Sequence, residues 1–292
     1  MTTPTAPDFS DLFSRPPDRY LDVGAGEVAY RRVGEGPDVL FVHGWPFGGA
    51  TFRRLLPHLA PHLTCHLVDL VGAGDSRFDR STPIGVDGHI RAVRRILDIL
   101  ELSRVAAVGH DSGGLIARHA LATDPRLRAL ALIDTEQSQG LSRRFRRFLS
   151  MRNLPGFEHI LAWAVMRRGL RRHPSLLGGC FVDAALLDGE FETLFLAPLR
   201  DDPDRRWATG QLLRSFDTGL VDALPALHAR IEAPVQLVWG EEDPFFPVEW
   251  ARSMADTFRD ARLEVIPGAK LLVHEERPTE VAQAMLPILL RD

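Results

Sequence analysis

The sequence predicts an α/β fold, with a mostly parallel sheet that carries helices on both faces. Apolar runs typical of buried strands alternate with segments that carry apolar residues at helical spacing. A helix-rich, strand-poor stretch interrupts this alternation between about Glu136 and Ala233. At 292 residues and 45% hydrophobic content, the chain is long enough to bury one large core. We therefore expect a core made of residues 1–135 and 234–292, with residues 136–233 as a helical cap over the carboxyl ends of the strands.

Strands are expected wherever a short apolar run ends at turn residues. The first two runs are separated by a Gly-Pro turn, and each later run follows a predicted helix. The expected strands are Glu27–Gly34, Asp38–Gly44, Leu63–Leu70, Arg104–Asp111, Leu127–Thr135, Pro234–Asp243 and Leu263–Ala269.

Helices are expected between these strands. In Val86–Leu102, apolar residues recur every three or four positions and form one face. Thr51–Ala60 has the same spacing, but Pro57 must interrupt or kink it. Further helices are expected at Ser112–Pro125, where proline ends the helix, at Val248–Phe258 and after Pro278.

Composition argues against several classes of protein. A formal charge of −4 does not fit a nucleic-acid-binding protein. The two cysteines, Cys65 and Cys180, form neither a disulfide framework nor a metal-binding spacing, so we expect no metal and no cofactor. No run reaches about 18 apolar residues, and no signal peptide is visible at the N-terminus. We expect a cytoplasmic protein that does not associate with membranes and takes a small-molecule substrate; the sequence does not predict its oligomeric state.

The stretch "VGHDSGG", Val108–Gly114, joins a predicted strand to a predicted helix. A nucleophile at such a sharp turn requires small residues two positions before and after it. Gly109 and Gly113 satisfy this rule if Asp111 is the nucleophile, whereas Ser112 in that role would put His110 at a small position. The alternative is a glycine-rich turn in which Asp111 only caps the helix.

Together with "HGWP" (His43–Pro46), "VWGEEDPFFP" (Val238–Pro247) and "HEERP" (His274–Pro278), this motif resembles the α/β-hydrolase fold. The resemblance covers about Leu21–Leu290. Within the α/β-hydrolase fold, the chain resembles the aspartate-nucleophile branch, which includes haloalkane dehalogenases, fluoroacetate dehalogenases and epoxide hydrolases.

The resemblance implies roles for several residues. The backbone N–H groups of Trp45 and Ser112 would form the oxyanion hole. Asp243 would be the acid that orients the base, and we prefer it to Asp134 and Glu242 for this role. The alternative is that Asp243 is only a turn residue before Pro244.

His43 is a further candidate in the same loop as Trp45, although it can equally fix the local backbone by hydrogen bonds.

The same resemblance places the catalytic base seven residues before Pro278, and this position holds Leu271. His274 lies three residues on and would share a face with Leu271 if the segment were helical. We keep two interpretations: His274 is a displaced base, or it is a structural residue. The usual leaving-group residues of the three activities are also absent, since Ser112 follows the nucleophile and neither tyrosine, Tyr20 or Tyr30, lies in the predicted cap.

The predicted cap carries nine arginines between Arg143 and Arg172 against one acid, Glu158. They form either a solvated helix face or a basic edge that steers an anionic substrate; a membrane-surface or calmodulin-binding helix is a third interpretation. Trp163 is a candidate pocket residue, although tryptophans more often pack a core.

The sequence is compatible with three functions. The first is hydrolysis of a small or medium apolar substrate by displacement at carbon, as in dehalogenases and epoxide hydrolases. The second is a non-hydrolytic biosynthetic enzyme that forms bonds, cyclises or decarboxylates on the same scaffold. The third is a ligand-binding protein that has lost catalysis.

Overall fold

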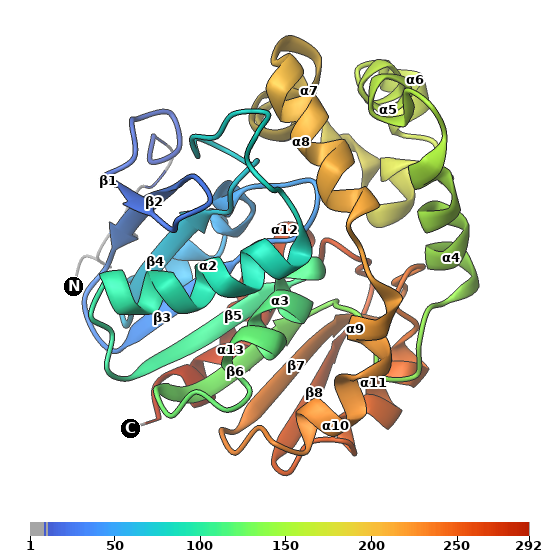
Figure 1. The fold of residues 1–292 in the computed structure, drawn as a ribbon. Coiled ribbons are helices and arrows are strands. Elements are labelled where there is room, and N and C mark those ends of the chain that lie inside the picture. Colours follow the sequence, from blue (N-terminus) through green and yellow to red (C-terminus); the bar gives the residue numbers. More distant parts are fainter. Residues whose placement is uncertain (1–8, 10, 292) are drawn as a thin grey trace, which may run out of the picture.

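A single eight-stranded sheet organises the protein (Figure 1). The computed structural model describes residues 9 and 11–291. The strand order is β1-β2-β4-β3-β5-β6-β7-β8, with antiparallel pairing of β1, β2 and β4 and parallel pairing from β4 through β3 to β8. The predicted α/β fold with a mostly parallel sheet is therefore confirmed. The strands are β1 (Arg19–Asp22), β2 (Glu27–Val33), β3 (Asp38–Val42), β4 (Thr64–Asp69), β5 (Val105–His110), β6 (Leu127–Ile133), β7 (Val235–Gly240) and β8 (Ala261–Ile266).

Helices bury both faces of this sheet. In β5, Val105 and Ala107 belong to one apolar cluster and Ala106 and Val108 to the other, because successive side chains of a strand point to opposite faces. The first cluster includes α2 (Val86–Ile99), α3 (Ser112–Leu121) and α11 (Val248–Ala255), and the second includes α1 (Leu56–Leu59) and α13 (Pro278–Leu289). Burial on both faces explains why the central strands, such as β5, are continuous apolar runs in the sequence, whereas the edge strand β8 alternates between buried and exposed residues.

Pro57 divides the helix expected at residues 51–60. A short 3₁₀ helix, η1 (Gly49–Phe52), precedes α1, and Pro57 lies in the first turn of α1. A proline is tolerated there because the first backbone N–H groups of a helix have no intrahelical acceptor.

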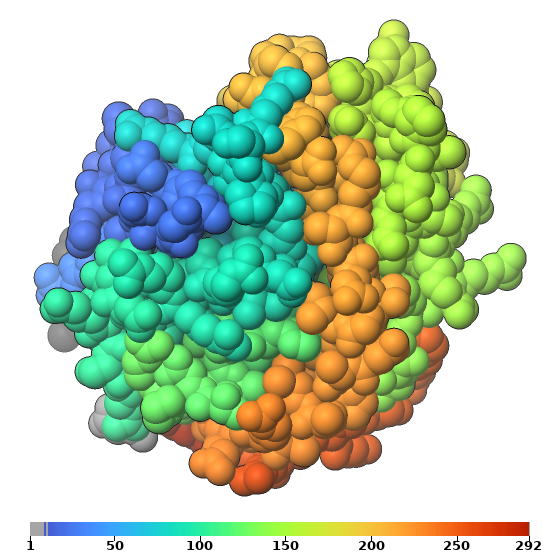
Figure 2. All heavy atoms as spheres, in the orientation of Figure 1, coloured from blue at the N-terminus to red at the C-terminus, as the bar shows by residue number. Residues whose placement is uncertain are grey.

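Between β6 and β7 the chain forms a helical insertion (Figure 1). Its helices α4 to α8 lie beyond the carboxyl ends of these strands, whereas α9 and α10 pack beside the sheet against α3. The structure gives the insertion no named strand. In Figure 2 its last part, in orange, lies against the teal segment that leads to α2. Its elements are α4 (Arg143–Ser150), η2 (Met151–Asn153), α5 (Phe157–Val165), α6 (Arg168–Arg171), η3 (Leu177–Cys180), η4 (Ala184–Leu187), η5 (Glu192–Leu196), α7 (Ala197–Asp201), α8 (Pro203–Arg214), α9 (Thr218–Asp222) and α10 (Leu224–His228).

Within residues 9 and 11–291, no helix has both the length and the apolar composition needed to cross a membrane. The expectation that the chain starts without a signal peptide falls largely on residues outside this range.

Candidate active site

Asp111 lies at the sharp turn between β5 and α3. Its backbone has φ 50° and ψ −134°, a conformation that costs free energy for any residue other than glycine. The turn leaves no room for side chains two residues away. A Cβ added to Gly113 would lie 2.1 Å from the carbonyl oxygen of Val42, and one added to Gly109 would lie 2.6 Å from Cα of Gly114. The geometry therefore explains why small residues flank Asp111 at these two positions.

Two backbone N–H groups converge on the carboxylate of Asp111. The N–H of Trp45 donates to Asp111 Oδ2 at 3.0 Å, and the N–H of the adjacent Ser112 lowers the pKa of the same carboxyl. Gly44 permits the approach, because a Cβ at this position would lie 2.5 Å from Cβ of Asp111. Such a pair of donors stabilises negative charge on one carboxylate oxygen or on the carbonyl oxygen of an ester formed there.

The electrostatic surroundings oppose ionisation of Asp111. Burial raises the pKa of Asp111 well above its ordinary value, and the negative charge of Glu136 adds to this effect, whereas the N–H groups of Ser112 and Trp45 lower the pKa. Glu136 itself is 1% exposed and accepts a hydrogen bond from Thr135 Oγ1 at 3.0 Å. Because only the ionised carboxylate is a good nucleophile, reaction at Asp111 should become faster as the pH rises.

Sequence reasoning did not single out Glu136 as a site residue. The available signal was its place three residues after the end of β6, at the sheet edge where open α/β sheets bind ligands.

Asp243 and Asp134 form a buried pair of acids at the ends of β7 and β6. Asp243 Oδ1 accepts the N–H groups of Phe245 at 2.7 Å and Phe246 at 3.1 Å, and Asp134 Oδ1 accepts that of Gly240 at 2.9 Å. The negative charge of Asp243 also raises the pKa of Asp134, and the second carboxyl oxygen of each acid is buried without a hydrogen-bond partner. Burial raises the pKa of Asp243 to about 7 and that of Asp134 well above its ordinary value. Asp243 thus interacts with a second acid, and no histidine in the described part of the chain hydrogen-bonds it.

The structure does not bring His274 to Asp111. The helix α12 (Val273–Glu276) begins after Leu272, which has non-helical φ −96° and ψ 46°. The assumption that Leu271 and His274 share a helical face is therefore wrong. The ring of His274 is fully buried, its Nε2 is 2.8 Å from Thr51 Oγ1, and burial lowers its pKa well below the ordinary value. An imidazole in this setting is neutral and acts as part of the core.

Leu271 lies next to the strand–helix turn through its main chain. His110 Nε2 is 3.0 Å from the carbonyl oxygen of Leu271, which ties this segment to the residue before Asp111. Burial lowers the pKa of His110 to about 4, so its ring is neutral and donates this hydrogen bond. The ring of His110 packs edge-on against that of His274, with 4.3 Å between centroids. Both rings support the turn and the loop beneath the candidate site.

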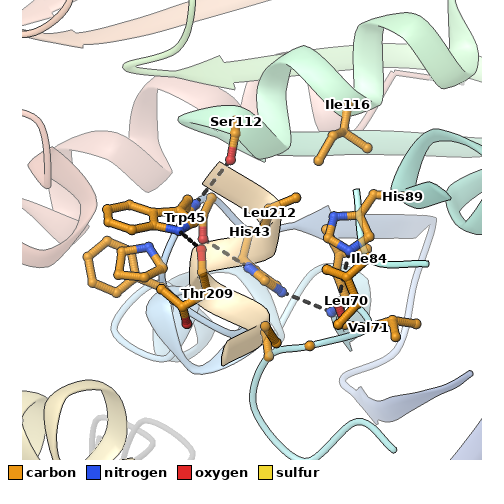
Figure 3. A pocket seen from close by; sticks show the side chains of 16 residues that line it. His43, Trp45, Leu70, Val71, Ile84, His89, Ser112, Ile116, Thr209 and Leu212 are labelled. Carbon is orange, nitrogen blue, oxygen red and sulfur yellow. Dashed lines mark hydrogen bonds between the residues drawn. The ribbon is translucent and has the colours of Figure 1, made fainter. Parts of the chain in front are cut away.

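His43 also forms hydrogen bonds with the main chain. Its Nδ1 is 3.0 Å from the carbonyl oxygen of Gly44, and its Nε2 accepts the N–H of Leu70 at 2.9 Å. Burial lowers the pKa of His43, which is consistent with a neutral ring that donates from Nδ1 and accepts at Nε2. These bonds fix the loop that presents the N–H of Trp45 (Figure 3).

The indole of Trp45 connects this loop to the helical insertion. Its Nε1–H donates to the carbonyl oxygen of Thr209 in α8 at 2.9 Å (Figure 3). Trp163 has a different position: it is 54% exposed, the guanidinium of Arg167 lies 3.9 Å from the centre of its ring, and it lines neither described cavity.

Two cavities lie between the core and the helical insertion. The smaller, about 20 Å³, touches Trp45 and Ser112 and is closed on the other side by Thr209 and Leu212 of α8 (Figure 3). The larger, about 300 Å³, is lined by Phe47 of the core and Phe195 of the insertion, and Asp111 lines neither of these two cavities. Within residues 9 and 11–291, no group of three or more His, Cys, Asp or Glu side chains is arranged to hold a metal ion.

Comparison with known proteins assigns the family. The alpha/beta hydrolase fold model matches residues 37–278. A pimeloyl-[acyl-carrier protein] methyl ester esterase from Chromobacterium violaceum is 31% identical over 269 residues, which is 84% of this chain and 92% of the relative. The esterase of the same name from Xanthomonas campestris pv. campestris is 42% identical over 101 residues, and this match spans only 38% of its length. The chain therefore belongs to the alpha/beta hydrolase fold family.

The structural comparison agrees with this assignment. A haloalkane dehalogenase from Bradyrhizobium elkani superimposes with a TM-score of 0.77 over 93% of this chain and 96% of its own. At 21% sequence identity, this likeness supports the fold alone. The named relatives are hydrolases of different types, so the type of reaction must be argued from the site.

Proposed function

We propose that this protein is an enzyme in which the carboxylate of Asp111 attacks a saturated carbon of a small or medium apolar substrate. The observation that carries the proposal is the pair of N–H groups, from Trp45 and Ser112, on the Asp111 carboxylate. One carboxylate oxygen accepts these donors while the other forms the new bond to carbon. The C–X bond breaks as this C–O bond forms, and X leaves with the electron pair as a halide or an alkoxide.

An aspartate nucleophile suits displacement at carbon because the product is an ester. Water cleaves such an ester at its carbonyl and restores the carboxylate, whereas serine would give an ether with no comparable exit. In this mechanism residues 1–135 and 234–292 form the core and residues 136–233 form the cap over Asp111. The family resemblance to dehalogenases and epoxide hydrolases supports the same chemistry.

The second half-reaction lacks an evident base. Ester hydrolysis needs a group that takes a proton from water, and such a base typically contributes about 10²–10⁴-fold to the rate. Leu271 has no ionisable group, and the ring of His274 bonds Thr51. This observation favours a second candidate, a non-hydrolytic enzyme on the same scaffold for which activated water would be harmful.

The esterase relatives raise the question of whether Ser112 is the nucleophile. Ser112 Oγ accepts the N–H of Trp45 at 3.0 Å, and no imidazole in the described part of the chain hydrogen-bonds it. A serine without a base is a poor nucleophile at neutral pH, whereas a carboxyl loses its proton without one, even where burial raises its pKa. The geometry therefore supports Asp111 over Ser112.

Labelling with an alkyl bromide tests the proposal. Intact-mass spectrometry of the wild-type protein should show one added alkyl group, and peptide mapping should locate it on Asp111. Asp111→Asn should not be labelled, whereas Ser112→Ala should retain labelling. Labelling that persists in Asp111→Asn, or its loss only in Ser112→Ala, would contradict the assignment. Slow loss of the adduct would support the non-hydrolytic candidate, and rapid turnover would support the hydrolase.

A further inference from the structure

One segment of the insertion concentrates positive charge in a protein that is otherwise acidic. Residues 143–172 contain nine arginines and one acid, Glu158, whereas the other 262 residues contain 26 basic and 38 acidic side chains. The carboxylate of Glu158 is already bound, since Arg214 lies 3.0 Å from it. An anionic surface is therefore attracted to this segment and repelled by the rest of the molecule.

Four of the nine arginines have no carboxylate partner. The other five are Arg168, Arg171 and Arg172, which pair with Asp188, and Arg144 and Arg152, which donate to main-chain carbonyl oxygens. In the described part of the chain, the unpaired and exposed arginines are Arg143, Arg146, Arg147 and Arg167. The first three share one face of α4, because they are three and four positions apart, and the opposite face is buried.

Large apolar side chains are exposed in the same segment. Among residues 9 and 11–291, six large hydrophobic residues are exposed, and four of them are Leu154, Ile160, Trp163 and Leu170. Ile160 is 57% exposed and shares one face of α5 with Trp163, because the two are three positions apart. The guanidinium of Arg167 lies against the ring of Trp163, and this pairing of an aromatic ring with a long cationic side chain suits a boundary between lipid and water.

These side chains lie on neighbouring elements at the rim of the molecule. The short helix η2 contacts both α4 and α5, and α6 contacts α5. In Figure 1 these helices form the outer rim of the insertion, and in Figure 2 the yellow-green atoms of the segment project from the surface. The outer edge is defined here by the four unpaired arginines and the four exposed apolar residues. It is basic, apolar and convex.

Two other interpretations of the arginines agree less well with the structure. None of the nine lines either described cavity, so an anionic group bound there would not contact them. A partner that binds an apolar helix face would need Phe145 and Leu149 of α4, and both are buried in the insertion.

We infer that the outer edge binds reversibly to the surface of a membrane that contains anionic lipids. The unpaired arginines contact lipid headgroups, while Ile160 and Trp163 enter the boundary between headgroups and acyl chains. Charge and buried apolar area both strengthen binding of this kind, which requires no spanning helix. The expectation of no membrane association was based on the lack of a long apolar run and did not consider this mode of binding. The inference is independent of the reaction proposed at Asp111.

Sedimentation with lipid vesicles tests the charge. The full-length protein should bind vesicles of phosphatidylcholine and phosphatidylglycerol in equal parts at least about tenfold more tightly than vesicles of phosphatidylcholine alone. Arg146→Gln/Arg147→Gln should weaken this binding about 25-fold, because an arginine near an anionic surface contributes roughly fivefold. Arg91→Gln/Arg95→Gln removes two exposed arginines of α2 and is the matched control, which should bind like wild type.

A second pair of variants tests the apolar contact. Ile160→Ser/Trp163→Ser should weaken binding to the mixed vesicles at least about tenfold, whereas Leu290→Ser, at an exposed leucine outside the insertion, should not. Absence of binding to the mixed vesicles, or an equal loss in either control, would overturn the inference. Binding that Ile160→Ser/Trp163→Ser retains would refute insertion into the lipid. Binding of poly-glutamate but not of vesicles, lost in Arg146→Gln/Arg147→Gln, would also overturn the inference and would identify an acidic protein partner instead.

Discussion

Replacing Leu271 by histidine should supply the missing general base and so restore hydrolysis of the ester formed on Asp111. The main chain of Leu271 is held by His110, directly beside Asp111, and the neighbouring N–H of Leu272 bonds the carbonyl oxygen of Cys180 at 3.3 Å. Burial raises the pKa of the Cys180 thiol to about 12, and the negative charges of Asp243 and Asp111 contribute to this shift. We expect an imidazole at position 271 to lie near the ester on Asp111 and near an acid able to orient it.

The expected gain follows from the role of a general base. Decay of the alkyl adduct should accelerate about 10²–10⁴-fold, which corresponds to roughly 3–5 kcal/mol of transition-state stabilisation. The faster decay of the adduct in Leu271→His should appear as the pH rises through about 7, because Asp243 then ionises and can accept a hydrogen bond from the imidazole N–H. Exchange of a buried leucine for histidine should also lower the free energy of unfolding by about 1–3 kcal/mol.

The assay is a pulse and chase. Wild-type protein and variant are labelled with the same alkyl bromide, the excess is removed, and intact mass is followed over time. Leu272→His, one position further along the same segment, is the matched control and should decay at the wild-type rate. Addition of Asp243→Asn to Leu271→His should remove most of the gain. If a folded Leu271→His protein releases the adduct no faster than wild type, our account of the missing base is wrong.

Three further predictions concern neighbouring residues. His274→Ala should lower the free energy of unfolding by about 2–4 kcal/mol, because it empties a buried site and removes the bond to Thr51, but it should leave adduct formation within twofold of wild type; a tenfold loss in a folded variant would instead identify His274 as catalytic. Gly44→Ala should slow labelling of Asp111 more than tenfold, since the new methyl group would lie 2.7 Å from Asp111 Oδ2, whereas Gly169→Ala, which meets open space, should label normally. The raised pKa of Asp243 means that the folded protein holds this proton more tightly than the unfolded chain, so wild-type stability should fall as the pH rises from about 4 to about 7; denaturant titrations of Asp243→Asn should show a smaller fall.

The sequence predicted most of the fold because its signals are local. Buried strands and amphipathic helices each occupy a short stretch, and the order in which they alternate indicates a parallel sheet. The short strand β1 was not predicted, since Arg19–Asp22 has four residues and only Leu21 is buried. Asp111 was recognised for the same local reason, because the small residues that permit its turn lie within two positions of it.

Only the tertiary structure decided the environment of Asp111. Asp134 and Asp243 are 109 positions apart, and their charges interact because β6 and β7 are neighbours in the sheet. His274 follows Leu271 by three residues, yet its ring is directed to Thr51, because the helix begins only at Val273. Sequence distance does not determine where a side chain points when the backbone between two residues leaves regular geometry, and it does not determine which strand ends meet. The pairing of buried acids and the position of an imidazole therefore had to be read from the packed chain.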